Sequence, residues 1–397
     1  MIGARYDSWI FMNQISRSAI TLLSIFLPLT IGVPAWADEV TTNYFSNTYH
    51  ESRTKFLTAA KAAGGNLEHY RNPYLGAETE ELYADVATFN LPEAKRILVL
   101  GSGTHGVEGF AGSGIQVGLL REGITKNLPE DVGLLFYHAL NPYGFSYLRR
   151  FNEDNVDLNR NFVNHAKPYP PNEGYDKLAR LIEPKALTRW QNLKAKLAFA
   201  WYRITKGKLW LQKAISQGQY NHPKGIFFGG NAETWSNRTL QNIIERHLFP
   251  ASQVVLIDIH TGLGAYGAAE VIAEVRPETQ AYERMQKWWG HRVKIPLEGE
   301  SVSPPVMGSL KNGFTRLLPH TDVTAVSLEF GTSPLPEALW ALRAENYLHH
   351  HSDDEHLDAL AIKTELKRVF YPDKNDWKQM VWGQGKEVVQ QALDNIQ

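Results

Sequence analysis

The chain has 397 residues, of which 43% are hydrophobic and 21% are charged, and it contains no cysteine. This composition is typical of a folded globular protein, and it excludes disulfide bonds, cysteine-ligated zinc and a thiol nucleophile. The formal net charge of −1 gives the chain no bulk positive charge, so we expect no nucleic-acid partner.

The N-terminal segment has the pattern of an export signal. Arg17 precedes an apolar run, and Ala35 and Ala37 form a small-x-small cleavage pattern after it. We therefore expect residues 1–37 to be a signal peptide, and residues 38–397 to form a protein that is exported to the periplasm or secreted. An uncleaved membrane anchor is the alternative interpretation.

Helical and strand-like segments alternate along the rest of the chain. A helix is predicted near residues 49–60, where apolar side chains recur on one helical face before Gly64 and Gly65. The next predicted elements are a strand at 83–89, a strand at 96–100, a helix at 112–120, a strand at 133–137, a helix at 240–248, and strands at 253–257 and 324–328. Continuous apolar strands that alternate with helices predict an α/β fold with a mixed, mostly parallel central sheet and helices on both faces.

Residues 165–225 are interpreted as a helical insertion. Within it, residues 185–213 contain eight Lys and Arg side chains and no Asp or Glu. Apolar side chains recur there at helical spacing: Leu187, Trp190, Leu193, Leu197, Trp201 and Ile204. The favoured interpretation is that this stripe packs on the domain, because core-facing stripes are the usual cause of helical periodicity. The alternative is a weak contact with an anionic membrane surface.

Polar residues follow four of the predicted strands, where binding sites form in open α/β sheets. In chain order they are His105 and Glu108, then Arg149, Arg150, Asp157, Asn159 and Arg160, then His260, and finally Glu329. His105 and Glu108 are three residues apart, so both can face one ion. Two imidazoles and one carboxylate suit zinc and leave a fourth position open for water. With His260 as the third ligand, the pattern predicts a catalytic site with one Zn²⁺ per chain.

Two other site types fit the sequence less well. Gly101, Gly103 and Gly106 match the dinucleotide-binding fingerprint, but His105 lies inside this turn and the next strand does not end in an acid that would hold a ribose. The Gly-x-Ser-x-Gly motif of serine hydrolases does not occur in the chain.

These residues resemble those of the zinc carboxypeptidase superfamily, and more closely an uncharacterised bacterial branch of it. The resemblance runs from about residue 45 to the end of the chain. It rests on His105-x-x-Glu108, the turn Asn141-Pro-x-Gly, Arg150, the run Asp157-x-Asn159-Arg160-Asn161, His260 and Glu329. The string Asp258-Ile-His-Thr is also similar to aspartoacylases and succinylglutamate desuccinylases, which cleave N-acyl amino acids with the same metal set.

The resemblance implies a role for each of these side chains. His105, Glu108 and His260 would hold zinc, and Asp157 would orient the first histidine. Glu329 would be the general base and acid, and Arg150 would stabilise the developing oxyanion. Asn159 and Arg160 would bind a substrate carboxylate. The adjacent Arg149 is a second candidate for the role of Arg150 and is counted with the substrate-binding side chains. A structural ion pair of Arg160 with Asp157 is the alternative for that arginine.

The sequence departs from the family pattern at one point. Carboxypeptidases of this type have a clamp tyrosine on a mobile loop before the catalytic glutamate, but no tyrosine lies between Tyr282 and Glu329. Residues 296–314 can still form a lid, with Phe314, Arg316 or His320 as lining candidates. The expected activity is zinc-dependent hydrolysis of a peptide or amide bond next to a free carboxylate. An N-acyl amino acid deacylase of the aspartoacylase type and a non-catalytic, zinc-retaining binding protein are the alternatives.

Overall fold

The computed structural model of the protein describes residues 41–296, 299 and 301–396, so the expected signal peptide at residues 1–37 lies outside the described residues. Within the described ranges, no helix is both long enough and apolar enough to cross a bilayer.

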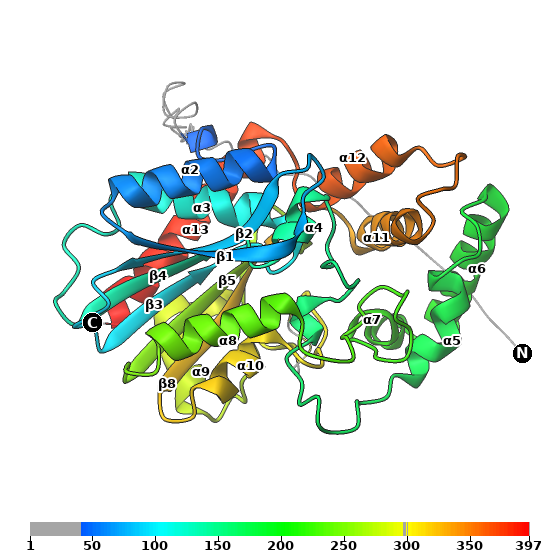
Figure 1. The fold of residues 1–397 in the computed structure, drawn as a ribbon. Helices are drawn as coiled ribbons and strands as arrows, with labels where there is room; N and C mark the ends of the chain where they lie inside the picture. Colours follow the sequence, from blue (N-terminus) through cyan, green and yellow to red (C-terminus); the bar gives the residue numbers. More distant parts are fainter. Residues whose placement is uncertain (1–40, 297–298, 300, 397) are drawn as a thin grey trace, which may run out of the picture.

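One eight-stranded mixed sheet organises the fold (Figure 1). The strands are β1 (Asn66–Leu75), β2 (Glu81–Phe89), β3 (Arg96–Gly101), β4 (Val132–His138), β5 (Gln253–Tyr266), β6 (Ala269–Ala273), β7 (Val293–Lys294) and β8 (Asp322–Gly331). Their order in the sheet is β1-β2-β4-β3-β5-β8-β6-β7. The central strands β4, β3, β5 and β8 are parallel, whereas β2 and β6 flank them antiparallel. The predicted mostly parallel sheet is therefore confirmed.

Helices cover both faces of the sheet, because successive residues of the central strands are buried on opposite sides. Leu98 and Leu100 belong to one apolar core, and Ile97 and Val99 belong to the other. The first core is closed by α2 (Tyr49–Ala62), α3 (Gly109–Arg121), α9 (Gln280–Trp289) and α13 (Asn375–Ile396). The second is closed by α8 (Trp235–His247) and α10 (Leu310–Leu317). Figure 1 shows α2, α3 and α13 on one side of the sheet and α8 and α10 on the other.

A third apolar cluster joins helices beside the sheet. It contains side chains of α5 (Glu173–Ile182), α6 (Arg189–Lys206), α7 (Lys208–Ser216), α11 (Leu335–His350) and α12 (Ala359–Phe370). The segment interpreted as a helical insertion thus contains α5, α6 and α7. These helices lie at one end of the molecule in Figure 1, next to α11 and away from α2 and α3.

The predicted strands and helices correspond to observed elements, but three strands were not predicted. β1 is an edge strand whose side chains are mostly exposed, so it lacks an apolar run. β6 has five residues and β7 has two, and these lengths are too short to give a periodic signal.

Candidate metal centre

The ends of three central strands bring the candidate side chains together. β3 ends at Gly101, and the chain continues through His105 into a 3-10 turn (Gly106–Glu108) that carries Glu108. His260 lies on β5 directly beside Glu329 on β8 in the parallel register. Gly106 packs so closely on the backbone of Gly144, at the Asn-Pro-x-Gly turn, that a Cβ atom would overlap it. The metal-site turn therefore requires glycine at this position.

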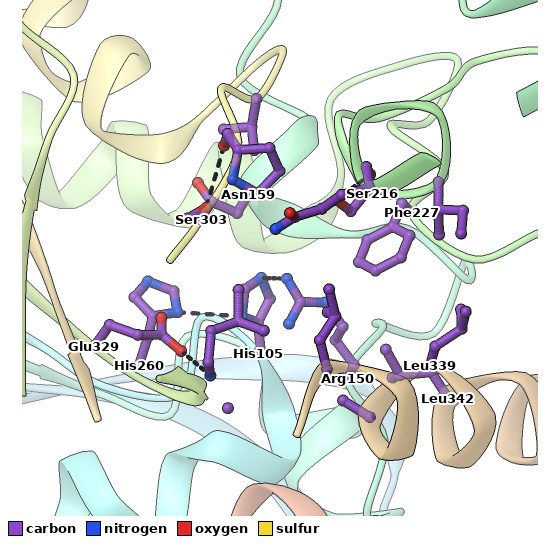
Figure 2. Close-up of a pocket in the computed structure, with 18 of the residues that line it drawn as sticks. His105, Arg150, Asn159, Ser216, Phe227, His260, Ser303, Glu329, Leu339 and Leu342 are labelled. Atoms are coloured by element: carbon purple, nitrogen blue, oxygen red, sulfur yellow. Dashed lines mark hydrogen bonds between the residues drawn. The ribbon is translucent and has the colours of Figure 1, made fainter. Parts of the chain in front are cut away.

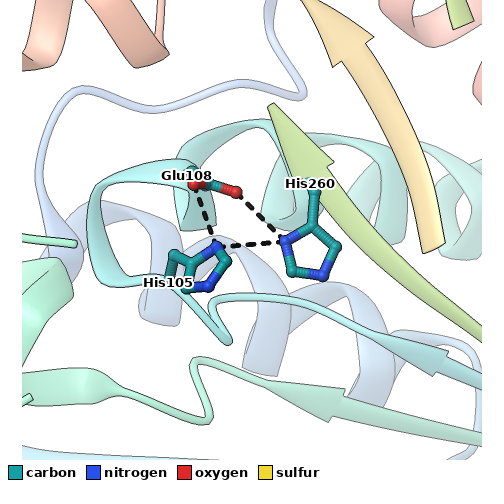
Figure 3. A group of neighbouring side chains, drawn as sticks. All are labelled: His105, Glu108 and His260. Carbon is teal, nitrogen blue, oxygen red and sulfur yellow. Dashed lines mark hydrogen bonds and ion pairs between the residues drawn. The ribbon is translucent and has the colours of Figure 1, made fainter. Parts of the chain in front are cut away.

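His105, Glu108 and His260 form a buried group around one point (Figure 3). The Nδ1 atoms of the two histidines are 3.2 Å apart. Glu108 lies against both rings, with Oε1 3.0 Å from His105 Nδ1 and Oε2 3.1 Å from His260 Nδ1. Two imidazole nitrogens and a carboxylate that converge in this way fit the ligand set of a catalytic zinc ion.

A carboxylate supports the outer nitrogen of each histidine. Asp157 Oδ1 lies 3.1 Å from His105 Nε2, as the resemblance implies, and Asp258 Oδ2 lies 2.7 Å from His260 Nε2. Thr104 and Tyr137 donate hydroxyl hydrogen bonds to the other oxygen of Asp258. Such carboxylates fix the orientation of metal-binding rings and direct Nδ1 toward the ion.

The role of Asp258 was not predicted from the sequence. The available signal was its spacing of two residues from His260 on one strand, because alternate side chains of a strand face the same side. Its orienting role depends on tertiary contacts, because Thr104 and Tyr137, which hold its other oxygen, are distant in the sequence.

The electrostatics of the group favour a positive charge at its centre. Burial disfavours the charged ring of His260, but Asp258 and Glu108 outweigh it and raise the pKa of this histidine to about 10. Burial also opposes ionisation of Glu108, yet His105, His260 and Arg150 hold its pKa well below the usual range. The carboxylate is therefore available as an anionic ligand at neutral pH.

Glu329 faces the same cavity as the metal group (Figure 2). Its Oε1 accepts a hydrogen bond of 2.9 Å from the Leu263 amide. Burial, followed by repulsion from the Glu108 carboxylate, raises the pKa of Glu329 to about 7. A carboxyl group that titrates near neutral pH can both accept and return a proton, as a general base and acid must.

Arg150 contacts the metal group directly. Its Nη1 donates to Glu108 Oε1 at 2.8 Å, and its Nε donates to Asp157 Oδ2 at 3.0 Å. The guanidinium also lines the cavity, where it faces the space beside the ligands. Its Nη2 lies 2.9 Å from His105 Nε2. The interaction of Arg150 with a polarised carbonyl oxygen stays a prediction.

Asn159 and Arg160 line the cavity on the side of α7. Arg160 is buried and donates to the backbone oxygens of Ser216 and Asn159. The ion pair of Arg160 with Asp157 is long, at 4.0 Å. A buried guanidinium without a close carboxylate is suited to bind an anionic group of a ligand. The role of Arg160 in binding a substrate carboxylate stays a prediction, and its ion pair with Asp157 is the alternative.

Arg149 does not line the cavity, contrary to the prediction that it contacts the substrate or takes the role of Arg150. Its side chain is buried away from the cavity, and its Nε lies 2.8 Å from Glu345 Oε1 on α11. Its Nη2 donates to Asn155 Oδ1 at 2.8 Å. The environment of Arg149 is that of a structural ion pair in the interior.

The three expected lid residues also lie elsewhere. Phe314 is a residue of α10 and is buried in the second apolar core. Arg316 donates to the Phe162 carbonyl, and His320 is exposed. From the expected lid segment, the cavity is lined instead by Ser303, Pro304, Val306 and Lys311. Among the described residues that line the cavity there is no tyrosine, so none of them can act as the family's clamp.

The buried His-Glu-His group with an adjacent glutamate has the composition of a catalytic zinc site. The chain belongs to the family described as "Protein of unknown function (DUF2817)", whose model matches residues 45–384. The comparison with curated proteins found no match.

Solved structures with a similar fold include a carboxypeptidase and a succinylglutamate desuccinylase. Carboxypeptidase A from Helicoverpa armigera is 12% identical, with 81% of this chain and 73% of that chain covered and a TM-score of 0.43. The succinylglutamate desuccinylase from Chromobacterium violaceum is 14% identical, with 81% and 74% covered and a TM-score of 0.35.

We expect zinc binding to depend on Asp258, which contacts the Nε2 atom of His260, as well as on the three ligands. A chain of residues 38–397 should bind about one zinc ion, and His105→Ala should abolish this binding. Asp258→Asn should weaken zinc affinity by about 10- to 100-fold, because the His260 ring loses its anionic partner. Competition with a chromophoric chelator measures these affinities. The control is Asp131→Asn, which alters an exposed ion pair with Arg96. If Asp258→Asn binds zinc with wild-type affinity, Asp258 does not orient His260.

Proposed function

We propose that this protein is a zinc-dependent hydrolase that cleaves a peptide or amide bond next to a free carboxylate. The observation that carries the proposal is the position of Glu329 beside His260 on neighbouring central strands, facing the cavity that His105, Glu108 and His260 also line. A metal group alone fits a structural or binding role, whereas a metal group with an adjacent proton-transfer residue fits catalysis.

His105, Glu108 and His260 would hold the zinc ion, which when bound lowers the pKa of water and polarises a carbonyl group. Glu329 takes the proton of the attacking water and delivers it to the leaving nitrogen. Arg150 faces the charge that develops on the carbonyl oxygen. Arg160 binds the substrate carboxylate through its planar guanidinium and so positions the bond to be cleaved.

The cavity is larger than a zinc site requires, with a volume of about 630 Å³. Figure 2 shows His105, His260 and Glu329 at one end and Leu339 and Leu342 at the other. The far wall is mostly apolar and includes Phe199 of α6, although Lys196 and Arg203 of the same helix also line the cavity. A substrate with a large apolar group beside the scissile bond fits this division of polar and apolar lining.

A second activity, deacylation of N-acyl amino acids, is favoured by one observation. The cavity has no lining tyrosine among the described residues, so the clamp that carboxypeptidases use on a peptide has no counterpart there. An N-acyl amino acid presents the same amide and carboxylate, and its acyl chain would lie along the apolar wall.

The experiment compares two substrate series with the zinc-loaded chain of residues 38–397. One series consists of dipeptides with apolar side chains, and the other of N-acyl amino acids with acyl chains of increasing length. Each substrate is also tested as its carboxamide, which lacks the free carboxylate. We expect turnover of at least one series and a much higher KM for the carboxamides. If zinc binds but neither series is hydrolysed, the proposal is wrong and a zinc-retaining binding protein is favoured.

A further inference from the structure

The outer face of α6 exposes an unusual set of large apolar side chains. Trp190, Leu193, Leu197, Trp201 and Ile204 are 46% to 81% exposed. Among the described residues, half of the large apolar side chains classed as exposed lie on α6 and α7. Large exposed apolar patches on a folded domain mark interaction surfaces.

This arrangement reverses the favoured sequence interpretation, in which the stripe packs on the domain. At 100° per residue, the five exposed side chains fall within a sector of roughly 80° on one side of the helix. The buried residues Ala195 and Phe199 lie on the opposite side and contact the third apolar cluster. The helix is thus held to the domain by its small buried face, and its larger apolar stripe faces outward.

The charges around the stripe are all positive. Residues 185–213 contain eight basic and no acidic side chains. Lys194 flanks one edge of the stripe, and Lys196 and Arg203 flank the other, each of them exposed. Tryptophans in an apolar face bordered by Lys and Arg are typical of helices that lie in the plane of a membrane interface.

The same helix borders the cavity. It lines the cavity with Lys196, Ala200 and Arg203, which lie between the buried face and the exposed stripe, and with Phe199 of the buried face. Lys208 of α7 also lines the cavity, so three basic side chains lie on this side of it. A surface that covered the stripe would therefore lie next to this side of the cavity.

We propose that α6 docks on the surface of an anionic lipid bilayer, with the stripe from Trp190 to Ile204 at the boundary between headgroups and acyl chains. Anionic headgroups match the uniformly basic flanks, whereas a second copy of this helix would place basic flanks against basic flanks. Docking in this orientation holds the α6 side of the cavity at the bilayer. The interaction goes beyond the proposed function and does not depend on zinc chemistry.

The test uses sedimentation of residues 38–397, which contain every described residue, with vesicles of phosphatidylglycerol and phosphatidylcholine. We expect sedimentation with mixed vesicles at low salt, a marked loss when salt is raised, and little sedimentation with pure phosphatidylcholine. The double variant Leu197→Glu, Ile204→Glu should reduce the bound fraction at least tenfold. Neither residue lines the cavity, so turnover of a water-soluble substrate should stay unchanged.

Leu360→Glu is the matched control, because Leu360 is 79% exposed on α12 and lies outside the stripe. This variant should sediment like the wild type. Three results would overturn the proposal: no sedimentation at low salt, equal sedimentation with neutral vesicles, or a wild-type dimer in analytical ultracentrifugation that the double variant abolishes. Zinc content and turnover are measured on the same samples, so a failure of docking is distinguishable from a failure of the proposed function.

Discussion

Replacing Glu329 with Gln is expected to lower kcat by about 10²- to 10⁴-fold while zinc remains bound. The amide of Gln can still accept the hydrogen bond from Leu263, so the local structure has little reason to change. It cannot take a proton from water at neutral pH, however, so proton transfer to the leaving nitrogen is lost. The measurements are kcat on the best substrate of the two series and zinc content per chain.

The matched control for this variant is Glu270→Gln. Glu270 lies on β6 opposite Glu329 in the sheet register, but it does not line the cavity. Its carboxylate accepts hydrogen bonds from Ser301 and Val302. We expect this variant to retain most of the wild-type turnover. Unchanged turnover in Glu329→Gln, with zinc present, would show that another group moves the proton.

Replacing Arg149 with Met is expected to destabilise the fold by about 3 to 5 kcal/mol, the usual cost of removing one partner from a buried ion pair. Arg149 and Glu345 are 1% and 0% exposed, and they meet at 2.8 Å. Without the guanidinium, Lys363 is the remaining ion-pair partner of the Glu345 carboxylate among the described residues. Urea unfolding of the two proteins, followed by far-UV circular dichroism, measures the difference in free energy.

An exposed ion pair provides the comparison for Arg149→Met. Lys177 and Glu173 are 61% and 84% exposed at a distance of 4.0 Å, so Lys177→Met should change stability by less than about 1 kcal/mol. In the fraction of Arg149→Met that remains folded, KM should be unchanged. A raised KM with unaltered stability would instead restore Arg149 as a substrate-binding residue.

The central strands and the candidate ligands could be predicted because both depend on local patterns. Buried parallel strands are continuous apolar runs, and their carboxyl ends meet at one edge of the sheet. Such runs are followed by four of the candidate side chains: His105, Glu108, His260 and Glu329. Their convergence can therefore be predicted from the sequence pattern. The edge strand β1 was not predicted, because its side chains are mostly exposed to solvent and form no continuous apolar run.

By itself, the sequence determined the mixed α/β sheet, the three candidate zinc ligands and the basic, amphipathic character of α6. Only the tertiary structure decided which of two adjacent arginines reaches the cavity, that Asp258 supports His260, and which way the apolar stripe of α6 faces. A periodic pattern indicates that side chains share one face of a helix, but it does not indicate which segment or solvent covers that face. Burial, ion pairing and exposure depend on segments distant in the chain, such as α11 against Arg149.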